Sequence, residues 1–91
     1  MTPQEWQMEL EMEGFTNIQT VSMQQGDIPA EPHTHMEHTV HVILKGQLEI
    51  IDANGVSTIY KIDDRVDFPA GTTHTAKIGE QGLKMIVGAK K

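Results

Sequence analysis

The stretch that decides the fold runs from His33 to Gly46 and reads HTHMEHTVHVILKG. On a β-strand, side chains of one parity face the same side, so His33 and His35 point together and His41 shares their parity. A histidine pair at i and i+2 is a natural clamp for a metal ion, because imidazole is the commonest protein ligand for Zn, Fe, Ni, Cu and Mn-type ions. This stretch predicts strands that carry histidines on one face.

A second informative stretch runs from Asp63 to His74 and reads DDRVDFPAGTTH. Pro69 and Gly71 suit a tight turn that starts the next strand in a fixed register and brings His74 to a defined depth. Taken alone, this stretch is equally consistent with a turn followed by a core histidine. A lone His-x-His pair is also common without any metal.

Short runs of β-branched and apolar residues surround both stretches, and turn residues separate them. Asn54-Gly55, between two such runs, is a strong hairpin signal. We see no helix-length segment between the runs, which argues against a parallel βαβ sheet and favours an antiparallel sandwich or barrel. The predicted strands are 17–23, 31–36, 38–45, 47–52, 56–62, 65–68, 72–78 and 83–88.

The first residues have a different pattern, that of a short helix. Thr2 and Glu5 form a capping-box sequence around Pro3, which suits the first helical position. Gly14 is a plausible stop, so we expect a helix over 3–13. The expected organisation is an N-terminal helix and lead-in over 1–16, followed by a single barrel over 17–91.

Composition excludes several classes of protein. The 91 residues hold seven Lys and Arg against thirteen Asp and Glu, and a formal charge of −6 argues against a nucleic-acid partner. The absence of cysteine excludes disulfides and thiolate metal sites. No apolar run approaches the length of a membrane span. A secretory signal begins with basic residues, and the first twenty residues hold none. We expect a cytoplasmic protein without membrane partners.

Together the two stretches read G-x6-H-x-H-x10-G over 26–46 and D-D-x4-P-x-G-x-x-H over 63–74. This order closely resembles the two signature motifs of the cupin superfamily, small β-barrels that hold a metal between the motifs. The resemblance covers residues 26–78. It implies an all-β, cupin-type antiparallel β-barrel of the jelly-roll kind with one divalent metal ion, and it raises the expectation of a homodimer.

Carried over residue by residue, the resemblance makes His33 and His35 the first two metal ligands and His74 the last. The usual glutamate ligand of the family falls on Thr39, which is a poor ligand. His41 lies two residues further along the same face, roughly 6.6 Å away on a strand. It replaces the glutamate only if the strand shifts or the imidazole leans back.

A bulge near His38 would supply that shift. We therefore expect a site of four histidines, in which changing His41 to Ala abolishes metal binding and changing Thr39 to Ala is silent. His38 itself has the opposite parity and falls in a predicted turn, so we expect it to be exposed to solvent.

A shell of neutral imidazoles leaves the full +2 charge on a divalent ion, which then attracts anionic ligands. The expected ligand is a small, anionic organic molecule. The expected reaction is that of an oxygenase, isomerase or decarboxylase, with Zn, Ni, Mn or Fe all compatible with imidazole. Tyr60, the only tyrosine, is a weak candidate for a catalytic proton donor and more typical of a core aromatic. The alternative is a non-catalytic module that binds or senses a small molecule or the metal.

Overall fold

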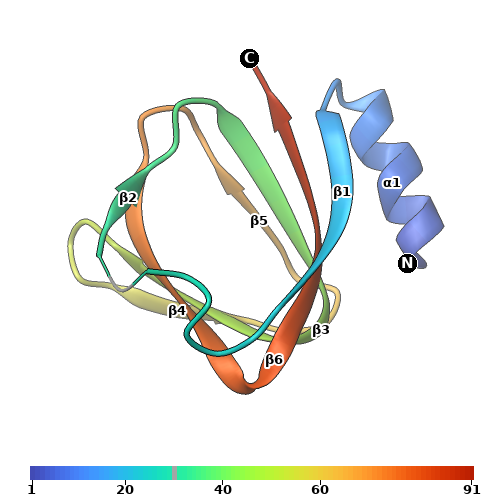
Figure 1. Cartoon of the computed structure of the whole chain (residues 1–91). Helices are drawn as coiled ribbons and strands as arrows, with labels where there is room; N and C mark the ends of the chain where they lie inside the picture. The colour runs from blue at the N-terminus through green and yellow to red at the C-terminus, as the bar shows by residue number, and fades with distance from the viewer. Residues whose placement is uncertain (30) are drawn as a thin grey trace.

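A short helix and a set of antiparallel strands make up the computed structural model, which describes residues 1–29 and 31–91 (Figure 1). The sheet order is β1-β6-β3-β4, while β2 pairs with β6 and β5 pairs with β3. This is the all-β barrel architecture that the sequence predicts. The elements are α1 (Pro3–Met12), β1 (Thr16–Met23), β2 (His33–Thr34), β3 (His38–Asp52), β4 (Ser57–Tyr60), β5 (Arg65–Phe68) and β6 (Thr73–Lys90).

The two long strands β3 and β6 form the frame of the barrel. They pair with each other along nearly their whole length, and the register shifts only around Lys45 and Gly46. Gly46 and Gly82 both have φ of +82°, and a Cβ on Gly46 would overlap the carbonyl oxygen of Gly82. These glycines let two strands bend where they lie closest. The ranges 38–45 and 47–52, predicted as two strands, therefore form one bent strand, β3. The ranges 72–78 and 83–88 likewise form β6.

The bends divide the shorter strands between two halves of the barrel. β1 pairs with the C-terminal half of β6, and β5 pairs with the N-terminal half of β3. β2 and β4 pair with the other halves, β2 through His33 opposite His74 and Thr34 opposite Thr73. Figure 1 shows these strands wrapped around a common interior. β2 is shorter than the predicted strand 31–36, whereas β5 matches its prediction.

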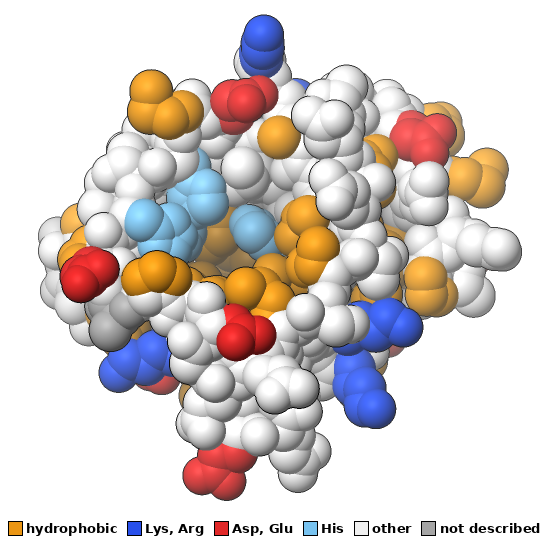
Figure 2. Space-filling view, viewed as in Figure 1, with side chains coloured by type: hydrophobic (Ala, Val, Ile, Leu, Met, Phe, Trp, Pro, Cys, Tyr) orange, Lys and Arg blue, Asp and Glu red, His pale blue; other side chains and the backbone are white. Residues whose placement is uncertain are grey.

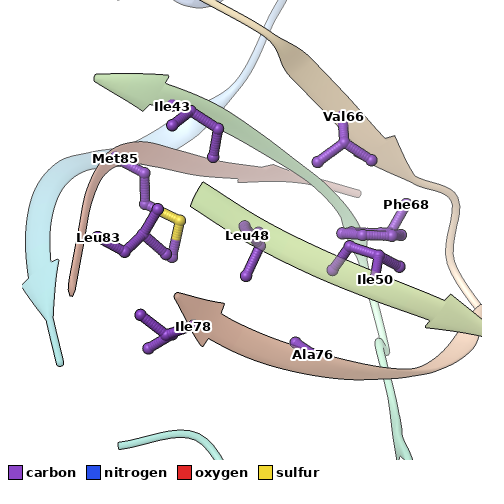
Figure 3. Close-up of a cluster of buried hydrophobic side chains, with 9 residues drawn as sticks. All are labelled: Ile43, Leu48, Ile50, Val66, Phe68, Ala76, Ile78, Leu83 and Met85. Atoms are coloured by element: carbon purple, nitrogen blue, oxygen red, sulfur yellow. The ribbon is translucent and has the colours of Figure 1, made fainter. Parts of the chain in front are cut away.

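The interior of the barrel is filled by apolar side chains from β3, β5 and β6 that point toward one another (Figure 3). Alternate residues of each strand face inward, as a strand period of two requires. Burial of this surface supplies the main stabilisation of a chain this size. The cluster consists of Ile43, Leu48, Ile50, Val66, Phe68, Ala76, Ile78, Leu83 and Met85.

A second apolar cluster lies under α1, on the outer face of the sheet. The helix begins with the predicted capping box, in which the Thr2 hydroxyl accepts from the Glu5 amide at 3.1 Å and the Glu5 carboxylate accepts from the Thr2 amide at 2.8 Å. Leu10 is fully buried, and α1 lies outside β1 in Figure 1. The helix therefore packs against β1 and β6, and Leu10 shares a buried cluster with side chains of β3. The cluster consists of Leu10, Phe15, Val40, Val42 and Ile86.

The predicted Asn54-Gly55 hairpin joins β3 to β4. Asp52 at its start accepts hydrogen bonds from the amides of Asn54 and Val56 at 2.8 and 3.0 Å, and Gly55 has φ of +82°. Such an Asx turn is a typical hairpin device. Among the described residues, no helix has the length and apolar character needed to cross a membrane.

Candidate metal centre

Three histidines converge at one end of the barrel interior. His33 lies on β2, His35 follows it, and His74 lies on β6 directly opposite His33. One ring nitrogen from each of the three lies within 4.8 Å of the others, and the Nε2 atoms of His35 and His74 are 3.2 Å apart. The separation of these two Nε2 atoms suits the distance of about 3 Å between ligands around an ion bound at about 2 Å.

The predicted turn at Pro69 and Gly71 holds this arrangement together. The Thr72 amide donates to the Pro69 carbonyl at 3.1 Å, which closes the turn. Two further backbone bonds tie the turn to His35, from the His35 amide to Thr72 and from the Gly71 amide to the His35 carbonyl, at 3.0 and 2.8 Å. The backbone of the second motif thus fixes the position of a histidine of the first.

His41 lies near the three histidines but outside their group. Its ring centre is 6.1 Å from that of His35, and it lines the same cavity. The register of β3 is continuous from His38 to Ile43 against β6, so the bulge predicted near His38 is absent and that expectation is wrong. Thr39 has its hydroxyl 3.3 Å from Nδ1 of His35. The regular register keeps His41 one step deeper in the barrel than Thr39.

The histidines open onto a cavity of about 500 Å³. Figure 2 shows it as a hollow with histidines on one side and hydrophobic side chains over its floor. Among the described lining residues, Asp27 and Glu31 are the carboxylates and neither lysine nor arginine is present. The size and the apolar wall suit a small organic molecule. The remaining lining residues are Met23, Ile28, Pro29, Pro32, Leu48, Ile50, Phe68, Ala76 and Met85.

Phe68 contacts three of the four histidines, a role that the sequence analysis missed. Its ring stacks on His35 with centres 5.1 Å apart and planes at 3°, lies 4.0 Å from His74, and meets His41 edge-on at 5.4 Å. Aromatic pairs at these distances restrict each other's orientation. The alternation of Val66 and Phe68 before Pro69 was the available signal, because it turns both side chains inward.

Burial lowers the basicity of the pocket histidines. The pKa of His41 falls from 6.5 to about 4, because the ring is removed from water and because a charge on His35 would repel its own. The pKa of His74 also falls to about 4, again through burial and then through His33 and His35. The pKa of His35 is lowered by burial and by His33. These imidazoles are therefore neutral near pH 7, the form in which a histidine binds metal.

Several nitrogens in the pocket have no partner. Within the described part of the chain, three buried ring nitrogens make no hydrogen bond. They are both nitrogens of His41 and Nδ1 of His74. Buried polar atoms in proteins are normally paired, so these nitrogens are suited to bind a ligand. A neutral, nitrogen-rich donor set of this kind fits a divalent transition metal.

Two other residues lie away from the cavity. His38 is half-buried on the opposite face of β3, where Nε2 lies 2.8 Å from an oxygen of Asp67, so the expectation of a solvent-exposed turn residue is wrong. β3 begins at His38, and Phe15 and Asp67 pack against the ring, which explains the partial burial. Tyr60 packs against the barrel core at the end of β4 and is not among the residues that line the histidine cavity.

No protein-family model matches the chain, and no curated protein matches it. Solved structures do. A DUF861 family protein from Thermotoga maritima is 20% identical, with a TM-score of 0.66 over 99% of this chain and 93% of its own. A cupin-2 domain containing protein from Shewanella frigidimarina is 15% identical, with a TM-score of 0.67 over 81% of this chain and 69% of its own.

A further similar structure is that of DMSP lyase DddQ from Ruegeria pomeroyi. It is 21% identical, with a TM-score of 0.68 over 81% of this chain, but the chain spans only 37% of that protein's length. All three likenesses concern the arrangement of strands. The chain has a cupin fold, as the two motifs predict.

Proposed function

We propose that this protein binds one divalent metal ion in its barrel and acts there on a small organic molecule. The observation that carries the proposal is the convergence of His33, His35 and His74, whose ring nitrogens lie within 4.8 Å of one another beside a cavity of about 500 Å³. Three convergent imidazoles beside an open, apolar space are the arrangement of a metal site that keeps a position free for substrate.

We assign His41 as the fourth ligand. Its two ring nitrogens are buried without a partner among the described residues, and its ring centre lies 6.1 Å from that of His35. Coordination would satisfy one of these nitrogens and offset the cost of burying them. Zn, Ni, Mn and Fe all suit this donor set.

A divalent ion held by neutral imidazoles keeps its full charge and polarises oxygen atoms that bind to it. The described lining residues contain no lysine or arginine, so an anionic group would find its attraction only at the histidine end of the cavity. Phe68 and Ile50 supply an apolar wall for the rest of the molecule. The reaction we propose is that of an oxygenase, isomerase or decarboxylase; that a lyase, DddQ, shares the fold supports chemistry in such a barrel.

A second candidate is a non-catalytic module that captures the metal or a small molecule. The apolar lining favours it, because Asp27 and Glu31 are the only acidic side chains among the described lining residues. Asp27 already accepts a hydrogen bond from the Gln24 amide at 2.7 Å. Glu31 is therefore the candidate general base, and Glu31→Gln would abolish turnover in an enzyme but leave a binding module unchanged.

A homodimer stays a prediction. The exposed apolar side chains Met8 and Met12 lie on α1, where they are 64% and 86% exposed. Sedimentation equilibrium would give the mass in solution.

The proposed metal site is tested by the metal content of the tag-free protein, measured by inductively coupled plasma mass spectrometry beside the His33→Ala, His35→Ala double variant. We expect about one equivalent of metal in the wild type and a loss in the double variant. His38→Ala is the matched control, because His38 lies on the outer face of β3 and should leave the metal content unchanged. A folded wild-type protein that neither carries metal nor takes it up on reconstitution would refute the proposal.

A further inference from the structure

We propose that Thr39 is a positioning residue, whose hydroxyl accepts a hydrogen bond from Nδ1 of His35 and so directs Nε2 of His35 into the metal site. This inference rests on the proposed metal-binding function. It replaces the expectation that Thr39 is silent. Thr39 does not bind the ion in this arrangement; it acts through His35.

The two ring nitrogens of His35 face different groups. Nδ1 lies 3.3 Å from the Thr39 hydroxyl oxygen, and Nε2 lies 3.2 Å from Nε2 of His74. A neutral imidazole carries one proton, so a hydrogen bond donated by Nδ1 leaves the lone pair on Nε2. Metal-binding histidines commonly depend on such an outer partner for their tautomer and orientation.

Stacking alone does not achieve this orientation. Phe68 lies parallel to the His35 ring, with centres 5.1 Å apart and an angle of 3°. A ring turned over by 180° would stack equally well, but it would exchange Nδ1 with a carbon and Nε2 with a carbon. Apart from the contact of Nε2 with His74, the bond to Thr39 distinguishes these two orientations, because an oxygen accepts a hydrogen bond from the nitrogen and not from a carbon.

The register of the sheet places both partners at the same level. Thr39 on β3 is paired with Phe68 on β5, so one side chain reaches the edge of His35 and the other its face. Among the described residues, Nδ1 of His74 and both nitrogens of His41 have no such partner. Of His35, His41 and His74, His35 is therefore the one whose outer nitrogen has a protein partner.

Thr39→Val tests the inference, because valine keeps the shape of threonine and removes the hydroxyl. We expect zinc affinity, measured by competition with a chelating dye, to fall about 10-fold. Thr39→Ser restores the hydroxyl and should bind zinc within about twofold of the wild type. Thr34→Val is the matched control, since the Thr34 hydroxyl faces outward and bonds to Thr73 at 2.8 Å.

A second readout uses the metal-free protein at pH 8. Nitrogen-15 NMR of the histidine rings should show His35 protonated on Nδ1 in the wild type and in Thr39→Ser, and a mixture of tautomers in Thr39→Val. An unchanged tautomer and unchanged zinc affinity in Thr39→Val would overturn the inference. If the wild type binds none of Zn, Ni, Mn and Fe, the proposed function fails, while the tautomer still decides whether Thr39 orients His35.

Discussion

β3 carries a histidine on each of its faces, and the two have opposite surroundings. His41 points into the barrel, where its two ring nitrogens are buried without a partner among the described residues and its pKa is lowered to about 4. His38 lies on the outer face, with Nε2 2.8 Å from a carboxylate oxygen of Asp67 and its ring edge-on to Phe15 at 5.3 Å. The same residue type on one strand is thus unpartnered inside and paired outside.

The contrast extends to the polar groups around each histidine. Outside, Arg65 donates two hydrogen bonds to Glu13 at 2.7 Å and further bonds to Asp67, which in turn contacts His38. This network ties the end of α1 to β5. Inside, buried nitrogens of His41 and His74 have no partner among the described residues. Paired polar groups hold a fold together, whereas unpaired buried ones weaken it and are retained where they bind a ligand.

The largest expected effect comes from removing a histidine of the inner face. His74→Ala deletes a proposed ligand that is 3% exposed. It should weaken zinc binding more than about 100-fold, because losing a ligand costs more than losing a group that only hydrogen-bonds to a ligand. His38→Ala removes a histidine of the outer face and should leave zinc affinity within about twofold. Isothermal titration calorimetry measures both. Equal losses in the two variants would erase the proposed distinction between the faces.

The pH dependence of stability should also separate the two faces. In the metal-free protein, His41 has a pKa of about 4 when folded and near 6.5 when unfolded. As the pH falls from 6.5 to 4, the unfolded chain takes up protons that the folded chain does not, so the free energy of unfolding decreases. His41 should account for a loss of about 2–3 kcal/mol over this range. Urea unfolding of the wild type and of His41→Leu at pH 8, 6 and 4.5 measures this share, because His74, whose pKa is also about 4, adds a loss of its own.

The outer network responds at lower pH. Arg65 lowers the pKa values of Glu13 and Asp67 below their ordinary values of 4.5 and 3.8. Their stabilisation is present above these values and is lost as the pH falls through the lowered ones. A flat stability between pH 6.5 and 4.5 would contradict the assignment of buried, neutral histidines to the inner face.

The sequence predicted the outline of this comparison but not its contacts. The helix, the Asn54-Gly55 hairpin and the parity of His33 and His35 follow from local patterns, and so did the fold class. The continuity of β3 through Gly46 did not, because a bend and a chain break both look like a glycine between two apolar runs. Which of these occurs depends on β6 lying alongside.

The same limitation applies to side-chain partners from distant parts of the chain. His38 and Asp67 are 29 residues apart, and neither position alone indicates the other. The contacts of Thr39 with His35 and of Phe68 with three histidines likewise depend on the packing of β5 beside β3. The alternation along each strand predicts which residues face inward. Which of these residues contact one another depends on the register between strands.

Breaking the outer network should reduce stability without affecting the metal. Arg65→Met leaves Glu13 and Asp67 without their cation on a face where their side chains are 35% and 32% exposed. We expect a loss of about 1–2 kcal/mol in the free energy of unfolding, because the bidentate pair is only partly screened by water. Zinc affinity should not change. Lys84→Met, at an exposed position, is the control and should be neutral.

The smallest effect has opposite signs on the two faces of β3. His41→Leu replaces two unpartnered buried nitrogens with carbon, so the metal-free protein should gain about 1 kcal/mol in the free energy of unfolding at pH 7. The same change at His38 deletes the hydrogen bond to Asp67 and should cost up to about 1 kcal/mol.

Zinc affinity should fall for His41→Leu and stay constant for His38→Leu. Thermal unfolding of both variants without metal gives the two signs. If His41→Leu were destabilising in the metal-free state, His41 would have a partner that satisfies its nitrogens, and its place in the metal site would need another explanation. A gain in stability coupled to a loss of zinc binding would mean that the inner face gives up stability to remain available for the ion.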